Sequence, residues 1–431
     1  MEEVKLGYID RVRMFKKDGR LYIASNAMNS FAFGVSNVIF NLYMIEAGFG
    51  EDFLGFFLSV SMFATALIAI VAGILTDRRS RKTIVLLSSF ISFSMVIIEY
   101  TSLDPMTLML SQVLLGLSSA FSQVSWFPYI TDLSTNEERA HLFGFSGGVA
   151  LLSVLAGNLV GGFLPGWLIP VVGTQTVLFL SYRYTLWFSL IPMFIGGVLI
   201  IPMSRDTAGA SVSTFGLQNV RNWGFITKYA STVTVVGLGA GMIVLFFNIF
   251  FAMEFAADSS LIGIIFGINT IVLAAGNFLA PAMADRVGKV RTVVLTEALS
   301  VPFLLMIAWA PVLYMAVIAY VARTALMNMG GPVSNAFFME SLEKEERATA
   351  VGIVRTGDSF VRGVAANIGG WLLAAGLYRL PYLLVSGLYV LSVVMFYFFF
   401  KGRETEFASI AAIQEQPLNI EIVDQEETDI T

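Results

Sequence analysis

Three charged residues recur at helical spacing inside an apolar stretch of the C-terminal half. Arg355, Asp358 and Arg362 follow an i, i+3, i+7 pattern, which places them within about 60° of one another on a helix. Two further charges, Glu297 and Arg323, lie within other long apolar stretches. A charge inside a membrane costs at least ~2.5 kcal/mol on insertion scales, so such residues usually pair with one another or mark a transport pathway.

The excess of positive charge in this group favours an anionic ligand. Three arginines stand against two carboxylates, and a planar guanidinium can hold a carboxylate or phosphate through two parallel hydrogen bonds. We therefore predict that Arg323 and Arg362 bind an anion. Asp358, Glu297 and Arg355 are predicted to form a charge network, with Asp358 and Glu297 as candidate proton carriers. The alternative is that Arg355 with Asp358, and Glu297 with one arginine, form structural salt bridges.

The composition is that of a membrane protein. The 431 residues are 56% hydrophobic and only 13% charged, whereas soluble domains are about 25% charged. The mean hydropathy is +0.77. The absence of cysteine and the single histidine, His141, exclude thiolate and multi-histidine metal centres. Since no nucleotide-binding loop or nucleophile–base pair is present either, we expect no cofactor, no bound metal and no enzyme activity.

Hydropathy predicts an all-α polytopic protein of twelve transmembrane helices in two pseudo-symmetric six-helix bundles. The first bundle covers residues 20–203, a cytoplasmic linker covers 204–225, and the second bundle covers 226–401. A cytoplasmic segment, 1–19, precedes them, and an acidic tail, 402–431, follows and is predicted to be flexible. The predicted spans are 20–45, 53–76, 83–102, 105–130, 143–165, 182–203, 226–256, 260–284, 291–310, 312–336, 348–375 and 380–401. An apolar outer loop, 164–180, has no equivalent in the second half.

The two halves repeat each other at a constant offset. Asp77-Arg78, between two apolar stretches, recurs 208 residues later as Asp285-Arg286. The same offset relates other landmarks, namely Gly55 to Gly263, Asp132 to Glu340, Glu138-Arg139 to Glu346-Arg347 and Gly162 to Gly370. A gap-free repeat of this kind is typical of transporters in which two halves rock about a central site.

The basic residues predict the topology. With both termini cytoplasmic, 21 of the 26 Lys and Arg residues fall on the cytoplasmic side and only Arg183 and Arg379 on the outside. This asymmetry follows the positive-inside rule. We therefore expect a multi-pass protein of the cell membrane, in contact with the lipid bilayer and with no nucleic-acid partner.

These motifs resemble those of the major facilitator superfamily over nearly the whole chain. Gly73-Ile-Leu-Thr-Asp77-Arg78-Arg79-Ser80-Arg81-Lys82 is similar to the family's loop 2–3 signature, with Ser80 in place of the usual glycine. The resemblance implies a functional monomer. It also implies that a gating latch, formed by Asp77, Arg78, Arg81, Asp285 and Arg286, holds the outward-facing state. Asn158 stands where the related antiporter motif of span 5 has proline.

The resemblance further implies that spans 1, 4, 7 and 10 line a central cavity. Polar stripes on spans 1, 4 and 10 agree with this, because unsatisfied amides are costly in lipid. From these stripes we predict additional substrate-binding residues at Asn29, Asn37, Gln112, Gln123 and Tyr320. The alternative is that these side chains make hydrogen bonds between packed helices.

Together these features predict a secondary active transporter that moves a small solute by alternating access. An organic anion is the favoured substrate and proton coupling is possible in principle through the buried acids. An exporter of amphiphilic or drug-like compounds is the first alternative. A sensor or lipid-handling protein built on a transporter fold is the second. The sequence does not distinguish import from export.

Overall fold

The computed structural model describes residues 15–77, 79–172, 177–204, 218, 220–343 and 345–414. The long elements in this part of the chain are all helices. In the first half they are α2 (Lys17–Glu46), α3 (Glu51–Asp77), α4 (Arg81–Thr101), α5 (Pro105–Leu133), α6 (Asn136–Val172) and α7 (Val177–Ile200). In the second half they are α8 (Trp223–Ile243), the 3-10 turn η2 (Val244–Phe246), α9 (Phe247–Phe255), α10 (Ser259–Val287), α11 (Lys289–Trp309), α12 (Leu313–Glu340), α13 (Arg347–Ala374) and α14 (Leu380–Gln414).

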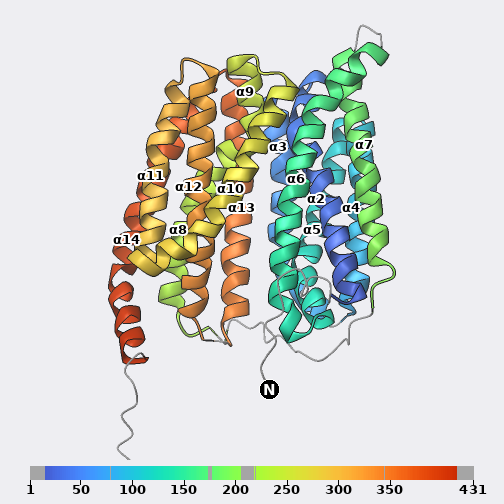
Figure 1. Ribbon diagram of the computed structural model, residues 1–431. Helices are drawn as coiled ribbons and strands as arrows, with labels where there is room; N and C mark the ends of the chain where they lie inside the picture. The colour runs from blue at the N-terminus through green and yellow to red at the C-terminus, as the bar shows by residue number, and fades with distance from the viewer. Residues whose placement is uncertain are drawn as a thin grey trace, which may run out of the picture.

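The helices form two bundles side by side, α2–α7 and α8–α14 (Figure 1). Successive helices run in alternating directions between two ends of the molecule. We name these the linker end, where α7 ends and α8 begins, and the distal end, where α9 ends and α10 begins. With α8, η2 and α9 counted as one span, this architecture has the twelve spans that the sequence predicts.

Ten of these spans are long and apolar enough to cross a membrane on their own. The two exceptions in the described part of the chain are α2, which carries the asparagine stripe, and α13, which carries Arg355, Asp358 and Arg362. Both helices are packed against several others, α2 against α6 and α7 and α13 against α3 and α8. Lower hydropathy is tolerated there because neighbouring helices, rather than lipid, cover much of their surface.

The sequence repeat is also a repeat of contacts at the linker end. Arg81, at the start of α4, forms an ion pair with Asp132 near the end of α5. At the positions 208 residues later, Lys289 of α11 forms an ion pair with Glu340 of α12. Each pair joins the third and fourth helices of its own bundle, so this charge pairing belongs to the scaffold of each half.

Two pairs of glycines bring the bundles into backbone contact in the distal half. A Cβ added to Gly55 of α3 would lie 2.8 Å from the Cα of Gly370 of α13. A Cβ added to Gly162 of α6 would lie 2.9 Å from the Cα of Gly263 of α10. The 208-residue offset converts one pair into the other. Nearer the linker end, Gly73 of α3 and Gly147 of α6 have no atom within 4 Å of an added Cβ, so the close approach does not extend to these positions.

Polar contacts reinforce the distal closure. The Asn41 amide of α2 donates to the Leu245 carbonyl at 2.6 Å and to Asn248 Oδ1 at 2.9 Å. These contacts explain why the predicted seventh span, 226–256, is broken at η2, since a neighbouring side chain satisfies a backbone group of the break. At the surface, the Tyr378 hydroxyl donates to Glu51 Oε1 at 2.9 Å. Burial raises the pKa of Tyr378 to about 12, and the bond to Glu51 acts in the same direction.

The predicted outer loop, 164–180, is largely helical, so its description as a loop was wrong. α6 continues to Val172 and α7 begins at Val177, which leaves only residues 173–176 outside the described part. The apolar sequence lets both helices extend, and the extended ends project at the distal end (Figure 1). α14 likewise continues to Gln414, past the predicted end of the last span. Residues 205–217 of the predicted linker lie outside the described residues.

The glycine contacts generate a prediction about conformation. Gly162→Val should disfavour the distal closure by about 1–3 kcal/mol, because the new side chain overlaps the Ser259 carbonyl and Gly263. The chain has no cysteine, so spin labels on Asp52→Cys and Leu377→Cys can report the distance between the bundles at the distal end. We expect a longer distance in Gly162→Val than in the parent.

Gly148→Val is the matched control on the same helix, because nothing lies within 4 Å of a Cβ added there. It should leave the distance distribution unchanged. Equal distributions in the two valine variants would contradict the assignment of the Gly162–Gly263 contact as part of the distal closure.

Candidate functional site

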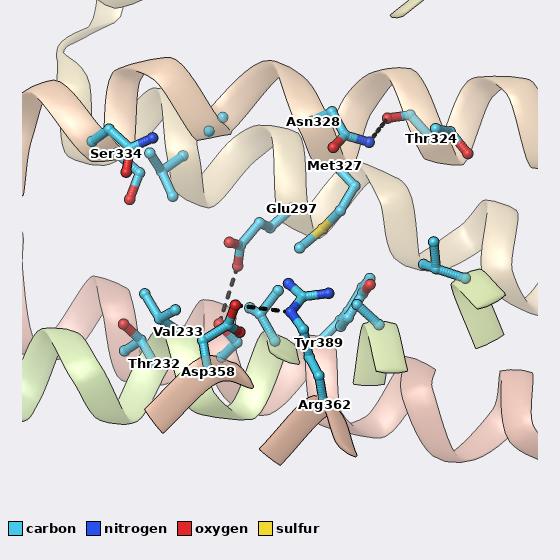
Figure 2. A pocket seen from close by; sticks show the side chains of 18 of the residues that line it. Thr232, Val233, Glu297, Thr324, Met327, Asn328, Ser334, Asp358, Arg362 and Tyr389 are labelled. Carbon is cyan, nitrogen blue, oxygen red and sulfur yellow. Dashed lines mark hydrogen bonds and ion pairs between the residues drawn. The ribbon is translucent and has the colours of Figure 1, made fainter. Parts of the chain in front are cut away.

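A cavity of about 770 Å³ lies among helices α8–α14, within the size range of small-molecule sites. From the first bundle, Asn37 of α2 reaches its lining. Five predicted charged residues line this one cavity, namely Glu297, Arg323, Arg355, Asp358 and Arg362, and Tyr320 lines it as well. Figure 2 shows Glu297 of α11 and the α13 residues Asp358 and Arg362 extending into the same space.

Asp358 and Arg362 form an ion pair one helical turn apart on α13. Arg362 Nε donates to Asp358 Oδ2 at 2.8 Å. The Arg362 side chain is 35% exposed and the Asp358 side chain is 18% exposed. The second oxygen, Asp358 Oδ1, is buried and accepts no hydrogen bond in the described structure. Because only the Nε edge of Arg362 is used, its two terminal amino groups remain available to a ligand in the cavity.

Arg323 of α12 is buried without a carboxylate partner among the described residues. Its side chain is held by aromatic groups. A terminal nitrogen donates to the Tyr389 hydroxyl, and the guanidinium carbon lies 5.9 Å from the Phe247 ring centre and 5.4 Å from that of Tyr389. Tyr320 packs on Phe247 with ring centres 4.4 Å apart. The Arg323 Nε has no hydrogen-bond partner, so this cation is stabilised by ring faces and remains incompletely satisfied.

Glu297 and Arg355 complete the charged lining. Glu297 Oε2 of α11 accepts a hydrogen bond from the Ser392 hydroxyl of α14 at 3.2 Å. Arg355 of α13 is exposed to the cavity and makes no ion pair or hydrogen bond with another described residue. The structure thus brings together the five charges that the sequence singled out, but pairs only two of them with each other.

The predicted amides of the first bundle have different positions. Asn37 lines the cavity. The Asn29 amide donates to the Ser25 carbonyl of its own helix at 2.9 Å and packs against Gly196 of α7. Gln123 of α5 is exposed but does not belong to the cavity lining. Only Asn37 among these three therefore meets the charged residues.

Gln112 leads to a residue that the sequence analysis missed. Its Nε2 donates to Glu99 Oε1 of α4 at 2.8 Å, and Ser111 donates to the same oxygen at 3.2 Å. Glu99 is 4% exposed and makes no ion pair in the described structure. The available signal was a single acid near the end of the apolar run 83–101. Gln112 therefore faces α4 and not the cavity.

The predicted latch residues lie at the linker end. Arg81 pairs with Asp132 inside the first bundle, and Asp285 and Arg286 are exposed. The Asp77 side chain and all of Arg78 lie outside the described part of the structure. No ion pair between the bundles joins the described latch residues in this conformation.

A family profile described as Major Facilitator Superfamily matches residues 22–252 and again 229–422. Among solved structures, the nucleoside transporter NupG is 13% identical, with a TM-score of 0.69 over 90% of this chain and 100% of that one. A bacterial homologue of the human lysosomal transporter Spinster, in an inward-facing and unoccupied conformation, is 16% identical (TM-score 0.69; 88% and 96% covered).

A D-xylose-proton symporter is 14% identical, with a TM-score of 0.69 over 88% of this chain and 97% of that one. At such low identity, these three similarities show the fold alone. No curated protein matches the sequence significantly.

The Gln112–Glu99 contact generates a prediction that separates a structural role from a binding role. Gln112→Leu should destabilise the protein by about 1–3 kcal/mol, because it leaves a buried carboxyl oxygen without one of its donors. The melting temperature in detergent should fall accordingly. Gln123→Leu, an exposed control on the same helix, should melt like the parent. An unchanged melting temperature in Gln112→Leu would contradict the structural role.

Proposed function

Because this chain belongs to the major facilitator superfamily, we propose that it carries a small organic anion across the cell membrane by alternating access, with the cavity of α8–α14 as its binding site. The chain is a multi-pass membrane transporter and not an enzyme. The fold neighbours include a nucleoside transporter and a sugar–proton symporter, so the fold sets no substrate class. The anion proposal rests on the cavity of this chain.

The observation that carries the proposal is the unbalanced positive charge of the cavity. Arg323 and Arg355 have no carboxylate partner among the described residues, and Arg362 keeps two free amino groups beside its pair with Asp358. An uncompensated cation is unfavourable in a membrane interior. A carboxylate or phosphate of the substrate would supply the missing partner through charge-assisted hydrogen bonds.

The contacts between the bundles support a working cycle. If the linker end is cytoplasmic, as the distribution of basic residues predicts, the glycine pairs close the outer side in this conformation. Rocking of the bundles would then open the distal end and bring the linker ends together. We propose that Asp77, Arg78, Asp285 and Arg286 act as a latch in that opposite state.

Asp358 is the residue that we propose for coupling. Its carboxylate forms an ion pair with Arg362. A substrate anion that binds Arg362 would compete with Asp358 for the guanidinium, and the released carboxylate would then take up a proton. In this scheme anion and proton bind together, so Glu297 need not titrate.

The apolar part of the lining favours one alternative. Phe247, Tyr320 and Met327 face the cavity together, and aromatic and methionine side chains accommodate varied apolar groups. An exporter of amphiphilic compounds would use this surface and leave the arginines in a structural role. The two functions differ in their dependence on Arg362.

We expect Arg362→Gln to weaken anion binding by at least 30-fold, since losing one partner of a buried charge-assisted pair costs about 2–5 kcal/mol. Arg362→Lys should retain part of the binding, because it keeps the charge but not the fork. Thermal stabilisation of the purified protein by a panel of anionic, neutral and cationic solutes identifies the ligand class, and proteoliposome uptake then measures transport.

Lys401→Gln is the control, because it removes a basic residue of α14 that is exposed and does not line the cavity. It should behave like the parent. Stabilisation by amphiphilic cations or neutral compounds alone, unaffected in Arg362→Gln, would favour the exporter function instead.

The proposed coupling predicts two results for Asp358→Asn. Anion exchange with the same pH on both sides of the membrane should be retained, whereas an imposed pH gradient should no longer accelerate uptake. The reason is that the asparagine side-chain amide does not gain or lose a proton at the pH values of such an assay. The test compares counterflow with gradient-driven uptake in the same proteoliposomes. Gradient-driven uptake equal to that of the parent would exclude Asp358 as the coupling residue.

A further inference from the structure

Two carboxylate oxygens of the cavity, Asp358 Oδ1 and Glu297 Oε1, accept no hydrogen bond from the described residues. Glu297 Oε2 accepts from Ser392, while no described residue donates to Oε1. Glu297 makes no ion pair in the described structure, in contrast to Asp358, which pairs with Arg362. Figure 2 shows the Glu297 carboxylate extending into the cavity from α11, on the side opposite the helix that carries Arg362.

The surroundings of Glu297 are polar only at a few points. Ser300 donates to the Glu297 backbone carbonyl and contacts the Met327 sulfur, so it does not satisfy the carboxylate. The Asn328 amide donates to the Thr324 carbonyl of its own helix at 2.8 Å. The half-buried Glu297 carboxylate lines the cavity. A carboxylate in such a site is stabilised by a donor or a cation, and Oε1 has neither from the described residues.

We propose that the substrate is a zwitterion, whose anionic group binds Arg362 and whose protonated amine binds Glu297. This inference rests on the proposed function, because it takes Arg362 as the anion site. Glu297 then determines specificity. It would prefer a substrate with an ammonium group over the same carboxylate without one.

The apolar lining fits the part of such a substrate between its two charges. Met327 lines the same cavity as Glu297 and Arg362 (Figure 2), as do Tyr389 and Phe396. A flexible thioether and aromatic rings can pack on a short hydrocarbon segment without competing for either charge. The ligand class is therefore an amino carboxylate or amino phosphate with an apolar spacer.

Local charge pairing supports this class, although the net charge of +1 from three arginines and two carboxylates is neutralised by a plain anion and left unchanged by a zwitterion. The groups that face it are Arg323, Arg355, Arg362, Asp358 and Glu297. A plain anion would pair with one arginine, add a negative charge to a space already lined by Asp358 and Glu297, and supply no donor to Glu297. A zwitterion satisfies an arginine and Glu297 simultaneously, and it places each of its charges against one of opposite sign.

The test uses matched pairs of ligands that differ only in the amine. The probes are α-, γ- and ε-amino carboxylates of six carbons and hexanoate, measured by direct binding to the purified, full-length protein. We expect the parent to bind at least one amino carboxylate tenfold or more tightly than hexanoate. Glu297→Gln should bind both within twofold of each other, with the affinity for hexanoate retained.

Glu297→Gln keeps an oxygen that can accept from Ser392, so the fold should persist, and an unchanged melting temperature verifies this. Glu297→Asp should restore part of the amine preference. The zwitterion inference is overturned if the parent binds hexanoate as tightly as every amino carboxylate, if no member of the panel binds, or if Glu297→Gln retains the preference.

Arg362→Gln separates this failure from failure of the proposed function. If the parent shows no amine preference and Arg362→Gln binds neither hexanoate nor the amino carboxylates, the zwitterion inference is overturned. The anion site at Arg362 is then still supported. Full binding of hexanoate by Arg362→Gln overturns the anion site itself, and the zwitterion inference with it.

Discussion

The two backbone contacts between the bundles are the constraint on which the rest of this conformation depends. Gly55 against Gly370 and Gly162 against Gly263 allow the helices to approach without side chains between them. Close approach through small residues is a common way to associate helices in membranes. The 208-residue repeat relates the two pairs, so each bundle contributes one glycine to each contact. The asparagine and tyrosine contacts at the distal end follow from this approach.

The two bundles share a scaffold but not a site. The ion pairs at the linker end and the glycine contacts occur in both halves, whereas Glu297, Arg323 and the α13 triad have uncharged counterparts in the first half. The first bundle instead buries one acid, Glu99, against an amide and a hydroxyl. The helical scaffold is therefore common to the two copies. The charged residues of the cavity occur in one copy and not at the equivalent positions of the other.

The sequence was informative where a single helix determines the geometry. The i, i+3, i+7 spacing predicted that Arg355, Asp358 and Arg362 share a face, and they line one cavity. It failed where the answer depends on a neighbouring helix. The polar stripe on α5 predicts which face of that helix carries Gln112. It does not predict the Glu99 carboxylate of α4, which is the group that Gln112 contacts. Asn29 shows the same limit, since a bond to its own backbone competes with any ligand.

Irregular features were the least predictable. The break at η2 leaves no mark in the hydropathy of the seventh span, because the Asn41 side chain that supports it comes from α2, about 200 residues away in sequence. It was also not predicted that α6 and α7 extend as helices into the stretch 164–180. The apolar stretch 164–180 was predicted as a loop because it has no equivalent in the second half, whereas α6 continues into it and accommodates Pro165 and Pro170.

The composition of the distal closure has a consequence for how the transporter responds to its surroundings. Glycine backbones and asparagine amides, which carry no charge, dominate this closure, and one carboxylate, Glu51, takes part as the acceptor of the Tyr378 hydroxyl. Ionic strength screens charged contacts but has little effect on packed backbones. Salt and acidity at the distal end therefore act on this closure mainly through Glu51, whereas the packed glycine contacts respond to neither.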